Sequence, residues 1–167
     1  MALDLRPLTP ADAHAYWHLR FEALEREPRA FGTSAEEHRA TTVADAATRL
    51  AGPDTWVVGV FADDRLRGMA GLAREARRKT RHKAGVWGVY VAAELRGRGV
   101  GRQLLTALIA HARTVPGVER LTLAVTPAQP AARALYRTLG FVPWGTEPAA
   151  LKLGAKYLDE EYLALVL

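Results

Sequence analysis

The hydrophobic and polar positions of this chain form short alternating runs and longer helical stripes. Apolar runs bounded by turn residues predict strands at 3–5, 55–61, 66–72, 84–91, 121–125, 141–144 and 162–167. Apolar residues at helical spacing predict longer helices at 9–27 and 130–140 and from Val100 to a stop at Pro116-Gly117, with one or two short helices inside 31–51. The elements therefore alternate in the order β-α-(α)-β-β-β-α-β-α-β-β.

Residues at the helix ends support this division. Thr9 can cap the first helix, Pro10 fits its first turn, and Asp12 can reach back as in a capping box. Trp17 and Phe21 recur along that helix at apolar spacing, as does Leu24. The helix at 130–140 has Ala132, Leu135, Tyr136 and Leu139 on one face, and Gly140 is well placed to cap its C-terminus.

The order of elements implies the fold class. Strands and helices that alternate in this way form a mixed, twisted sheet with helices on both faces. We expect an α/β (α+β) fold with about seven strands. The chain of 167 residues shows no long linker, internal repeat or low-complexity tract, so we expect one domain spanning 1–167.

Composition narrows the class of protein. The chain is 49% hydrophobic and 25% charged, as is ordinary for a globular protein. No apolar run approaches the roughly 20 residues that span a bilayer, and the N-terminus does not resemble a signal peptide. The absence of cysteine excludes disulfides, thiolate metal sites and a cysteine nucleophile. We expect a cytoplasmic protein.

The net charge of +5 favours an anionic partner, either a nucleic acid or a polyphosphate cofactor. Basic residues gather between 74 and 83, but no aromatic residues are interleaved with them as in a nucleic-acid module. A solvated hairpin loop explains this segment better. We therefore expect no nucleic-acid partner. His14, His18 and His111 stand on expected helices without a ligand spacing among them, so we expect no metal.

A glycine-rich segment follows the strand at 84–91 and leads directly into a helix. Glycine lets the backbone approach a ligand closely, and a helix start offers free N–H groups with a partial positive charge. Arginine adds charge and can bind phosphate through two hydrogen bonds. The segment contains Arg96, Gly97, Arg98, Gly99, Gly101 and Arg102. It predicts a phosphate-like anion at the helix start.

Two common anion motifs do not fit. The P-loop of nucleotide hydrolases ends in Gly-Lys-Ser/Thr, which is absent here. The dinucleotide fingerprint Gly-x-Gly-x-x-Gly fails because position 102 is Arg. That fingerprint also stands near the start of a βαβ unit, whereas three expected strands and a hairpin come first here.

Two segments resemble a known family. Arg96-x-x-Gly99-x-Gly101 resembles the Arg/Gln-x-x-Gly-x-Gly/Ala signature of the GNAT superfamily of N-acetyltransferases. Residues 129–141 resemble a second motif of that family, Asn-x-x-Ala-x-x-Leu-Tyr-x-x-x-Gly-Phe. The motifs stand in the family's order and on the expected elements. The resemblance implies a GNAT fold with the sheet splayed near its middle strands and acyl-CoA in the splay.

The resemblance also implies a set of cofactor contacts. The backbone of Val89 and Val91 would pair with the pantetheine arm of acetyl-CoA, and N–H groups from Gly97 to Arg102 would hold its pyrophosphate. The family usually has Asn where this chain has Gln129, which keeps the amide but adds a methylene. The cofactor residues implied are Val89, Tyr90, Val91, Arg96, Gly97, Arg98, Gly99, Val100, Gly101, Arg102 and Gln129.

The same resemblance gives Tyr136 a catalytic role as proton donor to the departing thiolate, although a core aromatic also fits that position. A strand N–H near Val91 would stabilise the oxyanion. The general base stays open among His82, Glu75, the Glu36-Glu37-His38 run and the acidic run 159–161.

The function implied is direct transfer of an acetyl group from acetyl-CoA to a primary amine in a ternary complex, because no cysteine is present to hold the acyl group. A non-catalytic acyl-CoA-binding module of the same fold is the alternative. The sequence leaves open the acceptor, whether a small molecule or a peptide, and leaves open a homodimer.

Overall fold

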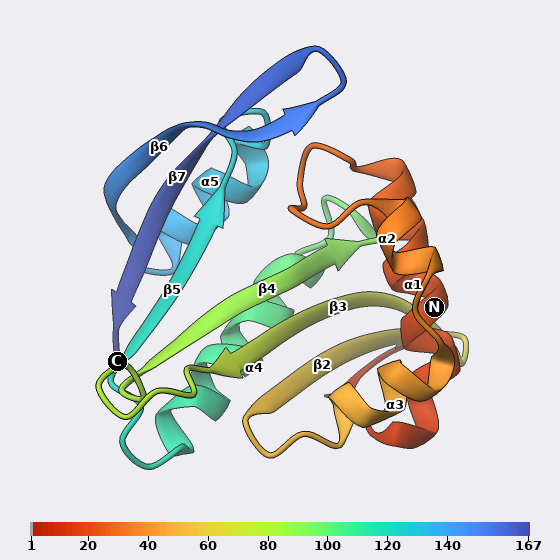
Figure 1. Cartoon of the computed structure of the whole chain (residues 1–167). Coiled ribbons are helices and arrows are strands. Elements are labelled where there is room, and N and C mark those ends of the chain that lie inside the picture. The colour runs from red at the N-terminus through yellow and green to blue at the C-terminus, as the bar shows by residue number, and fades with distance from the viewer. Residues whose placement is uncertain (1) are drawn as a thin grey trace.

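Seven strands form one mixed sheet in the order β1-β2-β3-β4-β5-β7-β6 in the computed structural model, which describes residues 2–167 (Figure 1). The strands are β1 (Leu3–Pro7), β2 (Thr55–Ala62), β3 (Arg65–Arg74), β4 (Lys83–Val91), β5 (Arg120–Val125), β6 (Val142–Leu153) and β7 (Lys156–Val166). The helices are α1 (Ala13–Arg26), α2 (Ala35–Arg39), α3 (Val43–Leu50), α4 (Val100–Thr114) and α5 (Pro130–Thr138). Short 3₁₀ turns, Pro10–Asp12 and Ala93–Leu95, precede α1 and α4.

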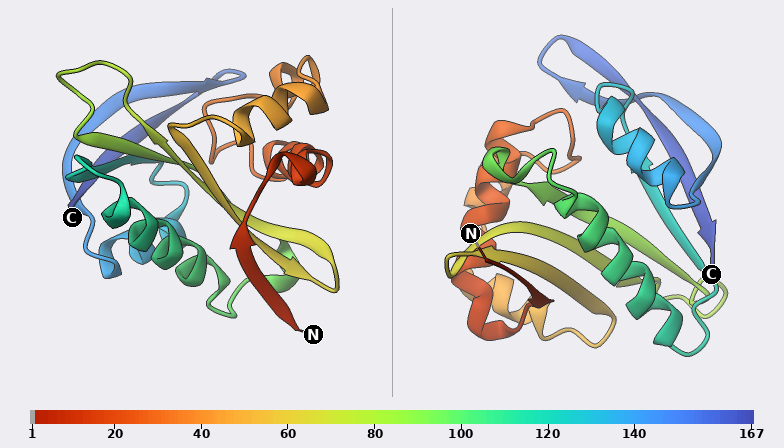
Figure 2. Two further views of the ribbon diagram at one scale, coloured as in Figure 1. Left: turned by 90° about the horizontal axis from the view of Figure 1, so that it is seen from below. Right: turned by 180° about the vertical axis from the view of Figure 1, so that it is seen from behind.

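Helices cover both faces of the sheet (Figure 2). Helices α1 and α3 pack on one face, where a buried cluster includes Tyr16, Leu50 and Met69. Helices α4 and α5 pack on the other face, where the larger buried cluster includes Leu104 and Tyr136. The predicted mixed α/β sheet with helices on both faces is therefore confirmed.

Strands β4 and β5 run parallel but pair over only three positions. Lys83, Ala84 and Gly85 of β4 oppose residues 120–122 of β5. Beyond Gly85, β4 stays with β3, whereas β5 continues beside β7. The two strands diverge visibly in Figure 1, so the sheet opens toward the C-terminal end of β4.

A bulge bends β4 where the sheet opens. Met69 of β3 opposes Tyr90 and Gly71 opposes Trp87, so two residues of β4 face one residue of β3 between these pairs. Gly88 lies in the bulge with φ of +63°, in the left-handed region that glycine adopts without strain. A bulge bends its strand and increases the local twist, so the direction of β4 changes at this point.

The first helix buries the predicted stripe only in part. Its buried residues include Tyr16, Leu19 and Arg20, which pack toward the sheet. Of the predicted stripe, Leu24 is buried, whereas Trp17 and Phe21 are only half-buried. Trp17 stacks on the His38 ring at 4.8 Å between ring centres, so α2 rather than the sheet covers this side.

The last two strands are longer than predicted and form an extended hairpin. The sequence predicted strands only near 141–144 and 162–167, because Pro143 and Pro148 interrupt the pattern. Strand β6 passes both prolines, with register shifts after Pro143 and Glu147. Much of the hairpin packs on no helix, and Trp144 is 66% exposed, so no buried face marks it in the sequence.

In the part of the chain that the structure describes, no helix is long and apolar enough to cross a membrane.

Candidate functional site

A cavity of about 390 Å³ lies where β4 ends, between the glycine loop and α5. Every residue that the sequence predicted for the cofactor lines this cavity except Arg98, which is exposed on the loop. Glu27, Phe31 and Leu135 complete part of the wall. We call this space the donor cavity.

The glycine loop offers a row of unpaired backbone donors to the donor cavity. Gly97 and Gly99 have φ of +72° and +76°, and a Cβ at either position would meet no atom within 4 Å. Among residues 2–167, no acceptor pairs with the N–H groups of residues 97–102. Gly99 is the N-cap of α4, so the helix start adds partial positive charge. The loop thus has the geometry of an anion site.

Two loop arginines are held by neighbouring groups. Arg96 donates from Nε to the Val91 carbonyl at 2.9 Å, and its Nη1 lies 2.9 Å from Glu27. Arg102 donates from Nη2 to the Thr138 hydroxyl at 2.8 Å. Arg96 therefore fixes the shape of the loop, and Arg102 connects the start of α4 to α5.

The outer edge of β4 also faces the opening of the sheet. The Ala92 N–H donates to the Arg67 carbonyl of β3 at 2.8 Å. Because backbone groups alternate in direction along a strand, the Val91 N–H points the other way, toward the divergence of β4 and β5. An extended ligand arm could pair with this edge as an added strand.

A second cavity, of about 280 Å³, continues along β4 from the donor cavity. The two cavities share Ala30, Phe31 and Val89. We call the second space the acceptor cavity. Its wall includes Arg20, Trp87, Tyr136 and Glu160, which come from α1, β4, α5 and β7.

Tyr136 lies with its ring in the core and its side chain at the acceptor cavity. The residue is 7% exposed, and its ring meets the Phe141 ring edge-on at 5.9 Å between centres. Its hydroxyl has no hydrogen-bond partner among the described residues. Burial raises the pKa of Tyr136 to about 12, so the hydroxyl keeps its proton at neutral pH and can donate it.

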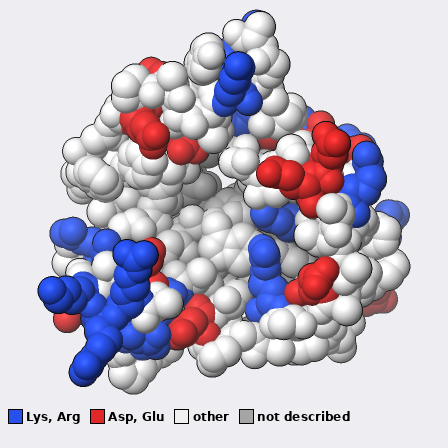
Figure 3. Space-filling model, viewed as in Figure 1, with Lys and Arg blue, Asp and Glu red and all other residues white. Residues whose placement is uncertain are grey.

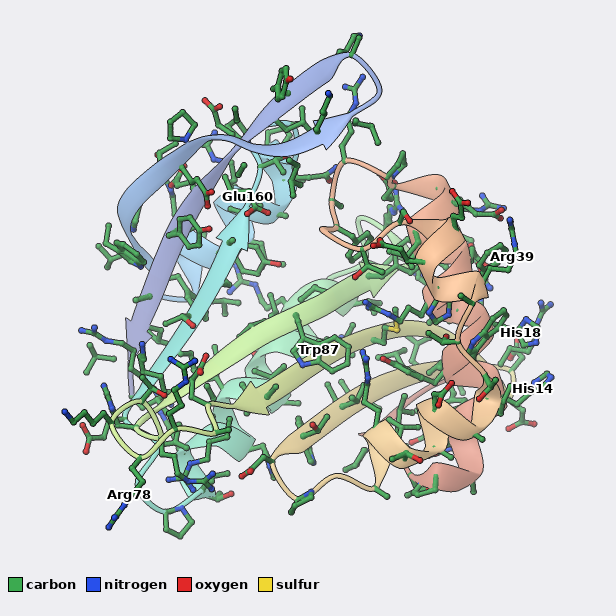
Figure 4. All side chains as sticks on the ribbon, viewed as in Figure 1. His14, His18, Arg39, Arg78, Trp87 and Glu160 are labelled. Carbon is green, nitrogen blue, oxygen red and sulfur yellow. The ribbon has the colours of Figure 1, made fainter. Side chains whose placement is uncertain are left out.

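Glu160 is the carboxylate of the acidic run 159–161 that reaches the acceptor cavity (Figure 4). Burial raises the pKa of this half-buried carboxyl above its usual range, and the nearby Glu147 charge adds to the effect. Its neighbours are engaged elsewhere: Asp159 accepts from the Ala149 N–H at 2.8 Å, and Glu161 pairs with Arg137 at 2.7 Å.

The structure places the other base candidates away from both cavities or in structural roles. His82 is exposed at the closed end of the sheet, where its carbonyl accepts from the Glu119 N–H at 2.8 Å. Glu36 and Glu75 are exposed and line neither cavity. Glu37 accepts from the Ser34 N–H at 2.8 Å as a helix cap. The His38 Nε2 lies 3.0 Å from the Trp17 carbonyl.

The described residues include no group of three or more His, Cys, Asp or Glu side chains placed to hold a metal ion. The basic residues of 74–83 lie at the closed end of the sheet, marked by Arg78 in Figure 4, away from the glycine loop.

A family model described as the acetyltransferase (GNAT) family matches residues 15–141, most of the chain. The chain belongs to this family. The match includes strands β4 and β5, the glycine loop and Tyr136. The resemblance of residues 96–101 and 129–141 to the GNAT family is therefore confirmed.

Solved structures of other proteins share the whole GNAT fold. The structure of yncA from Salmonella typhimurium, which contains acetyl-CoA, has a TM-score of 0.86 at 20% identity and covers 99% of this chain and 94% of that one. A GCN5-related N-acetyltransferase from Kribbella flavida has a TM-score of 0.82 at 26% identity, covering 99% and 98%. At 20% identity, the likeness to yncA shows the fold alone.

Among curated proteins, the L-methionine sulfoximine/L-methionine sulfone acetyltransferase of Pseudomonas aeruginosa is 37% identical over 77 residues. The matched segment is 46% of this GNAT chain and 44% of that protein, so it spans less than half of either.

Sequence reasoning missed several residues of the two cavities. Glu27 lies just beyond the end of α1 and shows no periodic signal. Arg20 did leave a signal, because it occupies a position one helical turn from Tyr16 and beside Leu19 on the buried face of α1. A charged residue on an apolar helix face is uncommon without a partner.

Proposed function

We propose that this GNAT protein transfers an acetyl group from acetyl-CoA directly to the amine of a small acceptor. The observation on which the proposal rests is the continuity of the two cavities. Unpaired N–H groups of residues 97–102 face the donor cavity, and Tyr136 and Glu160 lie on the adjoining acceptor cavity.

The residues present fit acetyl-CoA at the level of chemistry. The donors of residues 97–102 would hold the pyrophosphate without any side chain blocking the approach, since Gly97 and Gly99 have no Cβ. The free edge of β4 at Val89 and Val91 would pair with the amide groups of the pantetheine arm. Gln129 lines the same cavity and makes no side-chain cap on α5, so its amide is free to contact that arm.

Acetyl-CoA supplies an activated thioester. The acceptor nitrogen forms a bond to the acetyl carbon, the carbon–sulfur bond breaks, and the sulfur leaves as a thiolate. Tyr136 donates a proton to that thiolate, because its raised pKa keeps it protonated in the site. The Val91 N–H donates to the acetyl oxygen while charge develops there.

Glu160 accepts the proton that the acceptor ammonium must lose before it can attack. The nitrogen loses a second proton after its bond to the acetyl carbon has formed, and this proton replaces the one that Tyr136 gives to the thiolate. An alkyl ammonium has a pKa of about 10.4, so the amine arrives mainly protonated at neutral pH. Glu160 faces the acceptor cavity and its carboxylate is not held by an arginine, unlike that of Glu161. Its raised pKa makes it a stronger base than an exposed carboxylate.

The Pseudomonas aeruginosa relative is named for two amino-acid derivatives, which makes small amino acids suitable first acceptors to examine. A cytoplasmic location fits this chemistry, since acetyl-CoA is an intracellular metabolite.

Two measurements test the proposal. Calorimetric titration with acetyl-CoA should show binding at micromolar concentration, and a thiol-release screen across amino acids, amines and peptides should show turnover with at least one. Absence of binding at high micromolar concentration would overturn the proposal. Binding without thiol release across the panel would instead favour a non-catalytic acyl-CoA-binding module of the same fold.

A further inference from the structure

A third cavity, of about 300 Å³, lies between α1, α2 and α3 and joins the acceptor cavity. The two share Arg20, Gly32 and Thr33. Basic side chains stand on the helical side of the central hollow in Figure 3. Positive charge on the wall of the third cavity, beside the acceptor cavity, favours an acceptor that carries a negative group.

Arg20 is buried without a counter-charge. It is only 9% exposed, and no acceptor among residues 2–167 forms a hydrogen bond or ion pair with its guanidinium. Its Nη1 lies 3.4 Å from the position that a Cβ would take at Gly88, so the guanidinium reaches the bulge of β4. A buried charge without a partner costs free energy, which suggests that a ligand supplies the partner.

Three further groups lie beside Arg20. Arg49 is exposed and has no ion pair in the described chain, and its guanidinium lies 5.3 Å from the centre of the Trp87 ring, which Arg20 approaches at 5.4 Å. Trp87 Nε1 and the Tyr16 hydroxyl are fully buried and unpaired within residues 2–167. The labelled Trp87 lies over the sheet in Figure 4.

The carboxylates near these groups are engaged in helix capping. Glu37 and Asp45 line the third cavity, but Glu37 accepts from the Ser34 N–H at 2.8 Å and Asp45 from the Thr42 N–H at 2.7 Å. The third cavity therefore presents two guanidinium groups, and both of its carboxylates accept hydrogen bonds at helix starts. Trp87 lies on the adjoining acceptor cavity together with Arg20. Such a set of donors matches an anion with two acceptor oxygens.

We propose that Arg20 and Arg49 bind the carboxylate of the acceptor, so that this enzyme acetylates amino acids rather than simple amines. The inference rests on the proposed function and specifies its acceptor. Arg20 borders the acceptor cavity together with Tyr136 and Glu160. A carboxylate held at Arg20 would orient the rest of a small amino acid, including its amine, toward Val89 and the end of β4.

Matched acceptors test this inference. Each pair consists of an amino acid and the amine that lacks its carboxylate: phenylalanine with phenethylamine, and leucine with isoamylamine. For wild-type protein we expect kcat/KM from thiol release to be at least about tenfold higher for the amino acid, the size expected for one charge-assisted contact. Equal values for both members of each pair would overturn the inference.

Substitution of the arginines should remove that preference. Arg20→Gln and Arg49→Gln should raise KM for the amino acids about tenfold or more, with a smaller effect on kcat, so that the ratio of kcat/KM between an amino acid and its matched amine falls toward one. Arg113→Gln is the matched control, because Arg113 is exposed on α4 and lines none of the three cavities. A preference that survives both arginine substitutions would contradict the assignment, as would an equal loss in the control.

A binding measurement separates this inference from the proposed function. Amino acids and amines are titrated calorimetrically into protein saturated with acetyl-CoA or, if that does not bind, into the protein alone. Tighter binding of the amino acid to wild-type than to Arg49→Gln supports the carboxylate site even if no thiol is released. Equal binding of both members of a pair overturns it. Sodium phosphate is titrated alongside, and if it binds as tightly as the amino acids at the arginines, specificity for a carboxylate is excluded.

Discussion

Tyr136 and Glu160 show how burial tunes two titratable side chains in one cavity. Both have a pKa raised mainly by burial, but the consequences differ because a phenol and a carboxylic acid start from different values. The phenol stays protonated well above neutral pH and can donate. The carboxylate still ionises and becomes a better proton acceptor.

Replacement of Tyr136 by Phe should lower kcat about 100-fold, since a positioned proton donor contributes roughly that much. The dissociation constant of acetyl-CoA should change little, because the ring and its contact with Phe141 are retained. Steady-state thiol release and calorimetry measure the two effects. Unchanged kcat would assign Tyr136 to the core alone.

Replacement of Glu160 by Gln should lower kcat/KM at pH 7 about 100-fold and flatten the acidic limb of the pH–rate profile. Glu36→Gln, an exposed site outside both cavities, provides the control. If the pH–rate profile of Glu160→Gln keeps the acidic limb of the wild-type protein, Glu160 is not the general base.

The same substitution should also change stability with a definite sign. The pKa of Glu160 is raised in the folded state, so folding favours its protonated form. Wild-type protein therefore loses stability as pH rises from the ordinary value of 4.5 through the folded pKa, whereas Gln stays neutral. The melting temperature of Glu160→Gln should exceed that of wild-type at pH 7, and the difference should vanish below pH 4.5.

At the scale of elements, the loop between β4 and α4 depends on glycine for both shape and access. Gly99 caps α4 at φ of +76°, and its missing side chain leaves the unpaired N–H groups open. Gly140 plays a more ordinary part: it follows α5 with φ of +96°, so the predicted C-terminal cap is confirmed.

Substitution of Gly99 by Glu should abolish acetyl-CoA binding in calorimetry, because a carboxylate would occupy the anion site and repel a phosphate. Gly154→Glu is a matched control, since Gly154 has φ of +61° and open space around it in the turn between β6 and β7. Both variants impose similar backbone strain. Loss of binding in both would point to strain instead of the anion site.

At the scale of the whole molecule, ligand binding should couple the two parts of the divided sheet. Strands β4 and β5 pair at only three positions, so few backbone hydrogen bonds join the two parts of the sheet. A ligand that contacts β4, α4 and α5 at once adds connections across this divide.

Acetyl-CoA at about 100 times its dissociation constant should stabilise the protein by roughly 2.7 kcal/mol, as mass action requires for a ligand that binds only the folded state. Thermal unfolding with and without acetyl-CoA measures the shift. Gly99→Glu should show none, while Tyr136→Phe should keep it.

The sequence predicted the fold and the donor side of the site because both depend on local patterns. Strand alternation, helical stripes and capping residues are encoded within a few positions, and so is a glycine loop at a helix start. The length of strands β6 and β7 was underestimated because much of their hairpin packs against no helix. Without a buried face, the sequence shows no alternation of apolar and polar residues there.

The acceptor side was decided only by tertiary structure. Arg20, Trp87, Tyr136 and Glu160 come from four elements spread along the chain, and nothing in their spacing relates them. They meet because the bulge at Gly88 and the divergence of β4 from β5 open one space among α1, α5 and β7. Burial, missing partners and raised pKa values are properties of that space, so they arise only after the chain has folded.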